Sequence, residues 1–290
     1  MLQAFVINLD RHVGRMRFMQ TQLEALGVPF TRFQAVNGYD PARIADAAVA
    51  SFAPLSGGEI GCWESHRSIL KLILDEDLPG AFVLEDDVIL SSDFARLSFP
   101  PEFLDNCDIL KLDSFRQPAT YGAACIDLGG GRHVQRLLGN ERSTAAYFIT
   151  RQGAERLLAY SKNYFAAIDE VMVRRDYCIF WKLKVWKIAP SVAVQARFEL
   201  PEDALPDDIE DAIQTRVFKT RSDPKPAFGV LRKQQMRIRR LLDWDFGLVR
   251  KRREKRSLAF MRAKEGLIVA KPEFFTPNRA HIEHSISSAR

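Results

Sequence analysis

The sequence AFVINLDRHVGRMRFMQTQLEALGVPFTRFQAV, residues 4–36, predicts a strand, a helix and a second strand. Residues 4–9 are a short apolar run, rich enough in β-forming residues to be a buried strand. Apolar residues then recur every three or four positions from Val13 to Leu26, as on one helix face, and Gly27 ends the helix. A strand–helix–strand order is typical of a parallel α/β fold.

The same patterns continue along the chain. The expected strands are residues 29–36, 82–84, 108–112, 146–150 and 184–189, and the expected helices are residues 56–73 and 153–160. Prolines and acids between Pro201 and Asp208 mark a boundary. We therefore expect one α/β domain over residues 1–200 and a basic, mainly helical region over residues 201–290.

Composition and charge narrow the class of protein. The 290 residues are 47% hydrophobic and 27% charged, as in ordinary globular proteins. No run approaches the roughly 18 to 20 apolar residues that span a bilayer, and the first residues do not resemble a signal peptide, so we expect a cytoplasmic protein. The charge is uneven, because residues 215–264 carry +13 and residues 1–214 carry −8.

Three carboxylates interrupt an apolar run in AFVLEDDVIL, residues 81–90. Ligands of open α/β sheets gather at the carboxyl ends of the strands, and in an extended chain Glu85 and Asp87 point to the same side. Two such carboxylates can bind a hard divalent cation, which commonly shares its oxygens with substrate phosphates. The alternative is a solvated turn whose acids cap a helix.

Five blocks of the sequence occur in the order VINLDRHVGRM, SGGEIGCWESH, LEDDV, GNERSTAAYFITRQGAERLL and AIDEVM. This ordered set resembles glycosyltransferase family 25, over roughly residues 3–195. The resemblance implies a GT-A fold, which is a Rossmann-type mixed α/β sheet flanked by helices, for a catalytic domain over residues 1–200. It also implies a UDP-sugar donor, usually UDP-galactose, whose sugar is transferred with inversion to the glycan of a bacterial lipooligosaccharide or lipopolysaccharide.

The resemblance also implies roles for single residues. Asp87 would bind Mn²⁺ or Mg²⁺ directly, Glu85 would bind the ribose or the metal's water shell, and Asp86 would orient a neighbouring backbone. Inversion needs a base that takes the proton of the acceptor hydroxyl, and the resemblance indicates Asp169 or Glu170. The other expected donor-site residues are Asn8, Leu9, Asp10, Arg11, Arg15, Glu59, Ser65 and His66, and the expected acceptor-side residues are Thr144 and Tyr147.

Structural alternatives exist for several of these residues. Arg11 and Arg15 could be surface residues of the first helix, and Tyr147 could be a core aromatic residue. Asp169 and Glu170 could be favourable acids at a helix N-terminus.

Three further residues lie outside the pattern that carries the resemblance. His133, which follows a glycine turn, is a weak candidate for a further metal ligand. Trp63 and Glu64 depart from the family, which often has small or aliphatic residues there, and we expect them on the outer face of their helix.

The basic region has a helical pattern of its own. Apolar residues between Leu231 and Val249 keep helical spacing, with Arg and Lys on the other face and Trp244 and Phe246 near the apolar edge. This pattern fits a helix on an anionic membrane surface, and it would make the protein peripheral on the inner face of the inner membrane. Packing on the catalytic domain is an alternative, and we do not expect nucleic acid as a partner.

Two other functions compete with the glycosyltransferase hypothesis. A metal-dependent phosphohydrolase of the haloacid dehalogenase type needs an Asp two residues after its nucleophile, and Val88 stands there after Asp86. A non-catalytic membrane- or nucleic-acid-binding protein would use the basic region alone. The sequence does not determine the donor sugar, the linkage or the oligomeric state.

Overall fold

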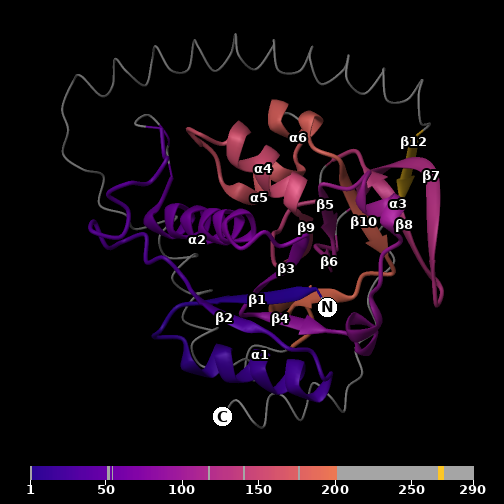
Figure 1. The fold of residues 1–290 in the computed structure, drawn as a ribbon, viewed down its shortest axis with the longest axis horizontal. Helices are drawn as coiled ribbons and strands as arrows, with labels where there is room; N and C mark the ends of the chain where they lie inside the picture. The colour runs from indigo at the N-terminus through magenta and orange to yellow at the C-terminus, as the bar shows by residue number, and fades with distance from the viewer. Residues whose placement is uncertain are drawn as a thin grey trace.

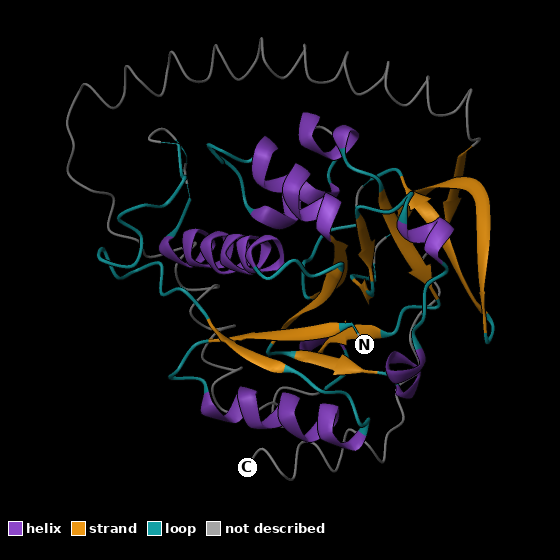
Figure 2. Cartoon of the chain, in the orientation of Figure 1, coloured by secondary structure: helices purple, strands orange, loops and turns teal. Residues whose placement is uncertain are grey.

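The computed structural model describes residues 2–50, 53, 55–116, 118–139, 141–175, 177–200 and 267–270 and shows a mixed α/β fold (Figures 1 and 2). A nine-stranded sheet has the spatial order β12 (Leu267–Ala270), β7 (Ala119–Gly129), β8 (Arg132–Leu137), β10 (Val185–Ala189), β5 (Ile109–Lys111), β9 (Ala146–Thr150), β3 (Gly80–Glu85), β1 (Gln3–Asn8) and β2 (Thr31–Gln34). A three-stranded sheet consists of β4 (Val88–Leu90), β11 (Ala193–Gln195) and β6 (Asp113–Ser114). The helices are α1 (Val13–Ala25), α2 (Gly57–Asp75), α3 (Pro101–Leu104), α4 (Arg151–Tyr160), α5 (Ile168–Val173) and α6 (Cys178–Lys182), with 3₁₀ turns at Ser92–Arg96 and Ala196–Phe198.

The predicted strand–helix–strand opening and the α/β class are confirmed. β1 pairs in parallel with both β2 and β3, so the carboxyl ends of three strands share one edge of the sheet. β9 runs antiparallel between β3 and β5, which makes the sheet mixed. Asn8 ends β1 and Glu85 ends β3. Two of the blocks found in the sequence therefore meet at this edge.

Side chains of the central strands alternate between two hydrophobic cores, one on each face of the sheet. Ala4 and Val6 belong to the core that contains residues of α1, and Phe5 and Ile7 belong to the core that contains residues of α2. Figure 1 shows α1 below the sheet and α2, α4 and α5 above it. Strands buried on both faces are continuously apolar, and this explains why residues 4–9 contain no charge.

The start of α2 has a fixed position against the chain that follows β2. Ser56 and Glu59 hydrogen-bond reciprocally across the first turn, which forms a capping box. Gly61 allows a close approach, because a Cβ at this position would lie 2.4 Å from the carbonyl oxygen of Val36. Ser65 Oγ accepts the amide of Val36 at 2.8 Å and donates to the carbonyl oxygen of Gly61 at 2.7 Å. These contacts orient α2 relative to the ends of the central strands.

The structure describes four residues of the C-terminal region. They form β12, which pairs antiparallel with β7 at the edge of the main sheet. The predicted amphipathic helix over residues 231–249 lies outside the described residues, so the division at residue 200 and the mainly helical region stay predictions. Within the part of the chain that the structure describes, every helix is too short or too polar to span a membrane.

Candidate active site

The acid triplet forms the turn between β3 and β4. Glu85 is the last residue of β3, and Val88 begins β4. Asp86 is 5% exposed; one of its oxygens accepts from Asn8 Nδ2 at 2.7 Å and the other lies 2.6 Å from Arg15 Nη2. A buried carboxylate needs partners of this kind. The alternative of a solvated turn is therefore wrong for Asp86.

Arg15 is a buried partner of two acids. It is 9% exposed, and its Nη2 also lies 3.2 Å from Asp87 Oδ2, so the guanidinium bridges Asp86 and Asp87. The side-chain Nε2 of Gln195 lies 3.5 Å from each of the two carboxylate oxygens of Asp87. Arg11, in contrast, is exposed and donates from Nε to the next residue's ring. Arg11 therefore lies at the surface before the start of α1, and the surface alternative is wrong for Arg15.

Glu85 contacts a second set of side chains. Thr144 Oγ1 donates to Glu85 Oε1 at 3.0 Å, and His66 Nε2 lies 4.0 Å from the same oxygen. The ring of His66 is buried, with Nδ1 2.8 Å from the hydroxyl of Tyr147. Burial lowers the pKa of His66 to about 3, so the ring is neutral at pH 7 and forms no charged pair with Glu85. Cys62, His66 and Glu85 place one potential metal-ligating atom each within 4.8 Å of the others.

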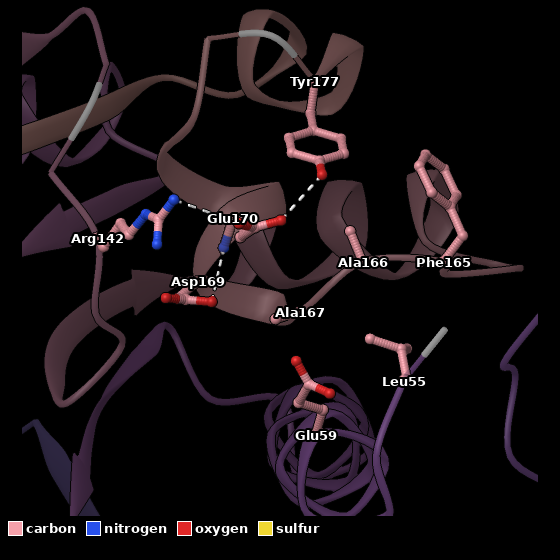
Figure 3. A pocket seen from close by; sticks show the side chains of 9 residues that line it. All are labelled: Leu55, Glu59, Arg142, Phe165, Ala166, Ala167, Asp169, Glu170 and Tyr177. Carbon is pink, nitrogen blue, oxygen red and sulfur yellow. Dashed lines mark hydrogen bonds and ion pairs between the residues drawn. The ribbon is translucent and has the colours of Figure 1, made fainter. Parts of the chain in front are cut away.

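Asp169 and Glu170 line a cavity of about 320 Å³ beside the start of α2 (Figure 3). Both oxygens of Glu170 have partners, since Arg174 Nη1 is 2.6 Å from Oε1 and the Tyr177 hydroxyl donates to Oε2 at 2.9 Å. Asp169 Oδ1 accepts the Glu170 amide at 2.9 Å, and among the described residues Oδ2 has no hydrogen-bond partner. Both acids lie in the first turn of α5, and Asp169 has an oxygen that can accept a proton.

Two short connections join the cavity to the acid turn. Arg142 lines the cavity, and Thr144, two residues later, donates a hydrogen bond to Glu85. The Cα atoms of residues two apart in the chain are separated by at most about 7 Å. On α2, Glu59 lines the cavity and His66 lies beside Glu85. Residues seven apart share one helix face, about 10 Å from each other. The acid turn and the cavity therefore lie close to each other.

A buried lysine fixes the loop that carries Arg142 and Thr144. Lys111 is 1% exposed and donates to the carbonyl oxygens of Arg142 and Ser143 at 3.1 and 2.7 Å. It also pairs with the buried carboxylate of Asp113 at 2.7 Å. Buried charges persist only when they are paired and hydrogen-bonded in this way, so the loop position depends on Lys111.

The structure gives some predicted site residues a structural partner instead of an open position. Tyr147 is fully buried, so its ring lies in the core and cannot contact an acceptor directly. Ser65 is 1% exposed and its hydroxyl holds the chain after β2, and the carbonyl of Leu9 accepts the amide of His12 at 2.9 Å. His133 lies on β8, four strands from β3, which is about 19 Å across the sheet. This separation places His133 away from the acid turn.

Several residues of the site were not predicted from the sequence, and two positions were predicted wrongly. The residues that were not predicted are Arg142, Phe165 and Tyr177, which line the cavity, and Gln195, which lies against Asp87. Trp63 and Glu64 do not lie on the outer face of α2: Trp63 is fully buried and donates from Nε1 to the carbonyl oxygen of Ala166 at 2.6 Å. Glu64 Oε1 accepts from the Tyr164 hydroxyl at 2.8 Å. The departure of these two positions from the family pattern is the signal in the sequence that marks them.

Comparison with known proteins gives a family match. The model of glycosyltransferase family 25 (LPS biosynthesis protein) matches residues 1–172. The chain is 25% identical over 215 residues to the lipooligosaccharide biosynthesis protein lic2B of Haemophilus influenzae, over 69% of this chain and 78% of that protein. It is 27% identical over 253 residues to the lacto-N-neotetraose biosynthesis glycosyltransferase LgtB of Neisseria meningitidis serogroup B, over 78% of this chain and 89% of LgtB. A segment of 63 residues, 22% of this chain and 10% of the relative, is 40% identical to human procollagen galactosyltransferase 2.

Proposed function

The chain belongs to glycosyltransferase family 25 and has a GT-A-like fold, and from this premise we propose that it is an inverting hexosyltransferase of lipooligosaccharide or lipopolysaccharide biosynthesis. The proposed donor is UDP-galactose, and the proposed acceptor is the oligosaccharide of the glycolipid. The human relative is named as a galactosyltransferase, which supports galactose as the sugar. The single observation that carries the proposal is that the Asp169 cavity lies close to the acid turn, through Arg142 and Thr144.

The acid turn is the proposed donor site. Asp87 fits a hard cation such as Mn²⁺ or Mg²⁺, because its side chain is 18% exposed and, among the residues that the structure describes, Oδ1 has only the long contact with Gln195 Nε2. A divalent cation bound there would neutralise the charge that develops on the β-phosphate as the sugar leaves. Arg15 lies beside Asp87 and would contact the diphosphate, and Glu85 would contact the ribose or the metal's water shell.

The Asp169 cavity is the proposed place of the acceptor hydroxyl. Asp169 Oδ2 would take the hydroxyl proton while the acceptor oxygen forms its bond to the anomeric carbon and the bond from that carbon to UDP breaks. Attack from the face opposite UDP inverts the anomeric centre. Glu170 is the weaker candidate for the base, because its two oxygens already bind Arg174 and Tyr177.

The basic C-terminal region would bring the protein to a membrane surface, where a lipid-linked acceptor would lie. Residues 215–264 carry +13, and anionic headgroups attract Lys and Arg near the surface by about 1 kcal/mol each. We propose that this region docks the protein on the inner face of the inner membrane.

A donor screen tests the proposed function. The full chain is incubated with Mn²⁺ and each of UDP-galactose, UDP-glucose, UDP-N-acetylglucosamine and UDP-N-acetylgalactosamine, and the release of UDP is measured with and without chelator. Chelator-sensitive release of UDP from UDP-galactose is the expected result. If UDP is released from another donor alone, the proposed donor sugar is wrong and the proposed glycosyl transfer stands. If UDP is released from none of the donors, the proposed function is wrong.

A further inference from the structure

A short segment before α5 exposes an aromatic ring at the edge of the candidate site. Phe165 is 43% exposed, although its neighbours Tyr164 and Ala166 are 1% and 7% exposed. Large apolar side chains at exposed positions are informative when they lie in a cavity with polar groups. Phe165 lines the same cavity as Asp169.

The segment is held in place on both sides of Phe165. The ring of Tyr164 stacks on Trp63 with 4.6 Å between centroids, and its hydroxyl donates to Glu64 Oε1 at 2.8 Å. Trp63 Nε1 donates to the carbonyl oxygen of Ala166 at 2.6 Å. Two adjacent residues of α2 therefore fix the residues before and after Phe165. A side chain between two fixed neighbours is presented in a defined direction, which lowers the entropy cost of binding a ligand.

The cavity combines aromatic rings with carboxylates. The centroids of Phe165 and Tyr177 are 5.9 Å apart, and the Tyr177 hydroxyl is bound to Glu170. Glu59 lies across the cavity on α2, and Asp169 lies beside Glu170 (Figure 3). A pyranose ring has one apolar face of C–H groups that packs on an aromatic ring, and hydroxyls at its edge that donate to carboxylates. The volume of about 320 Å³ is at the lower end for small-ligand pockets, which suits one or two sugar rings.

We propose that this cavity is the acceptor subsite and that it binds a neutral hexopyranose at the end of the acceptor glycan, with the sugar ring packed on Phe165. This inference rests on the proposed function, since it takes Asp169 as the base. Glu59, which the sequence resemblance put at the donor, caps α2 through Oε2 and offers Oε1 to acceptor hydroxyls instead. The cavity lining has three carboxylates and one arginine, Arg142, which pairs with Glu170, so the excess negative charge of Glu59 and Asp169 disfavours an anionic sugar at this position. Trp63 and Glu64 are positioning residues, because they act on the sugar only through the segment that carries Phe165.

Glycoside binding to the full-length protein tests the subsite directly. Methyl β-galactoside, methyl β-glucoside, methyl β-N-acetylglucosaminide and the anionic methyl β-glucuronide are titrated with and without UDP and Mn²⁺, and binding is followed by saturation-transfer NMR. The variants are Phe165→Ala, the conservative Phe165→Tyr, and Trp63→Phe, which removes the Nε1 donor and leaves a smaller aromatic ring beside Tyr164. Tyr160→Ala is the matched control, because Tyr160 is 38% exposed at the end of α4 and does not line the cavity.

The expected result is that a neutral glycoside binds and the glucuronide does not. Phe165→Ala should weaken that binding about tenfold, or 1.4 kcal/mol, and Phe165→Tyr and Tyr160→Ala should keep it within about twofold. In transfer assays with the bound glycoside, Phe165→Ala and Trp63→Phe should raise the acceptor KM and leave the donor KM unchanged. Trp63→Phe should not change kcat, which separates positioning from a general loss of structure.

Three results would overturn the proposal. They are equal glycoside binding by the wild type and Phe165→Ala, competition between glycoside and UDP for one place, and no neutral glycoside binding to the wild type under any of these conditions. A wrong proposed function would be recognised by a different result, which is the absence of UDP release from every donor. Glycoside binding is measured without turnover, so it reports on the subsite in either case.

Discussion

In the wild-type protein, His66 should make the free energy of unfolding fall as the pH falls. Replacing His66 by Gln should remove this contribution. The His66 side chain has an unfolded-state pKa near 6.5, and burial lowers the pKa to about 3 in the folded protein. Between these values the unfolded chain binds more protons than the folded chain, so the free energy of unfolding falls as pH falls. In this window, each unit by which the pH falls lowers the free energy of unfolding by about 1.4 kcal/mol. The loss between pH 7 and pH 4.5 is therefore about 2.5 kcal/mol.

Urea denaturation at pH 7 and pH 4.5 measures this contribution. The carboxylates titrate in both proteins, so the change in wild-type stability minus the change in His66→Gln stability isolates His66. His133→Gln on β8 is the control and should track the wild type. A difference below about 0.5 kcal/mol would refute the argument. A wild type that gains stability on acidification, relative to His66→Gln, would show that His66 is protonated and paired with Glu85.

Three further predictions concern the proposed reaction and its location. Asp169→Asn should lower kcat by about 10²- to 10⁴-fold with little change in donor affinity, and Glu170→Gln should lower it less; the reverse order in steady-state kinetics would move the base by one residue. Asp87→Ala and Asp87→Asn should abolish transfer and Glu85→Gln should weaken it less, and chelator should abolish wild-type transfer until Mn²⁺ is added; full activity in excess chelator would refute metal dependence. Removal of residues 211–290 should reduce sedimentation with anionic vesicles, and the binding of the full chain should weaken with salt because screening acts over about 10 Å at 0.1 M; vesicle binding that is unchanged by truncation would exclude membrane docking by this region.

The sequence predicted the elements whose hydrophobic pattern is regular. Residues 4–9 and 146–150 are apolar because they are buried on both faces, and the helix from Ser56 has a capping box that is visible as Ser and Glu three residues apart. The long hairpin of β7 and β8 was missed, because its strands are only half buried and their apolar residues do not alternate clearly. Its turn was recognised, since Gly129, Gly130 and Gly131 all have positive φ.

The residues that form the site were harder to predict than the residues of the hydrophobic cores. Contacts such as Arg15 with Asp86, or Thr144 with Glu85, join residues about sixty or seventy positions apart, and no local pattern encodes such pairs. The resemblance located the blocks, but it could not show which of two adjacent acids has a free oxygen. Trp63 contacts Ala166, 103 positions further along the chain, and no pattern within the helix reveals such a contact.

The transfer reaction with UDP-galactose tests the central claim most directly. The wild-type protein is incubated with UDP-α-galactose, Mn²⁺ and the methyl glycoside that binds best, and the product is analysed by proton NMR at the anomeric position. We predict a new β-linked galactoside formed in step with UDP release, and its loss in Asp169→Asn. An α-linked product would contradict inversion by Asp169, and the absence of both product and UDP release with every nucleotide sugar would contradict the assignment of this site as a glycosyltransferase centre.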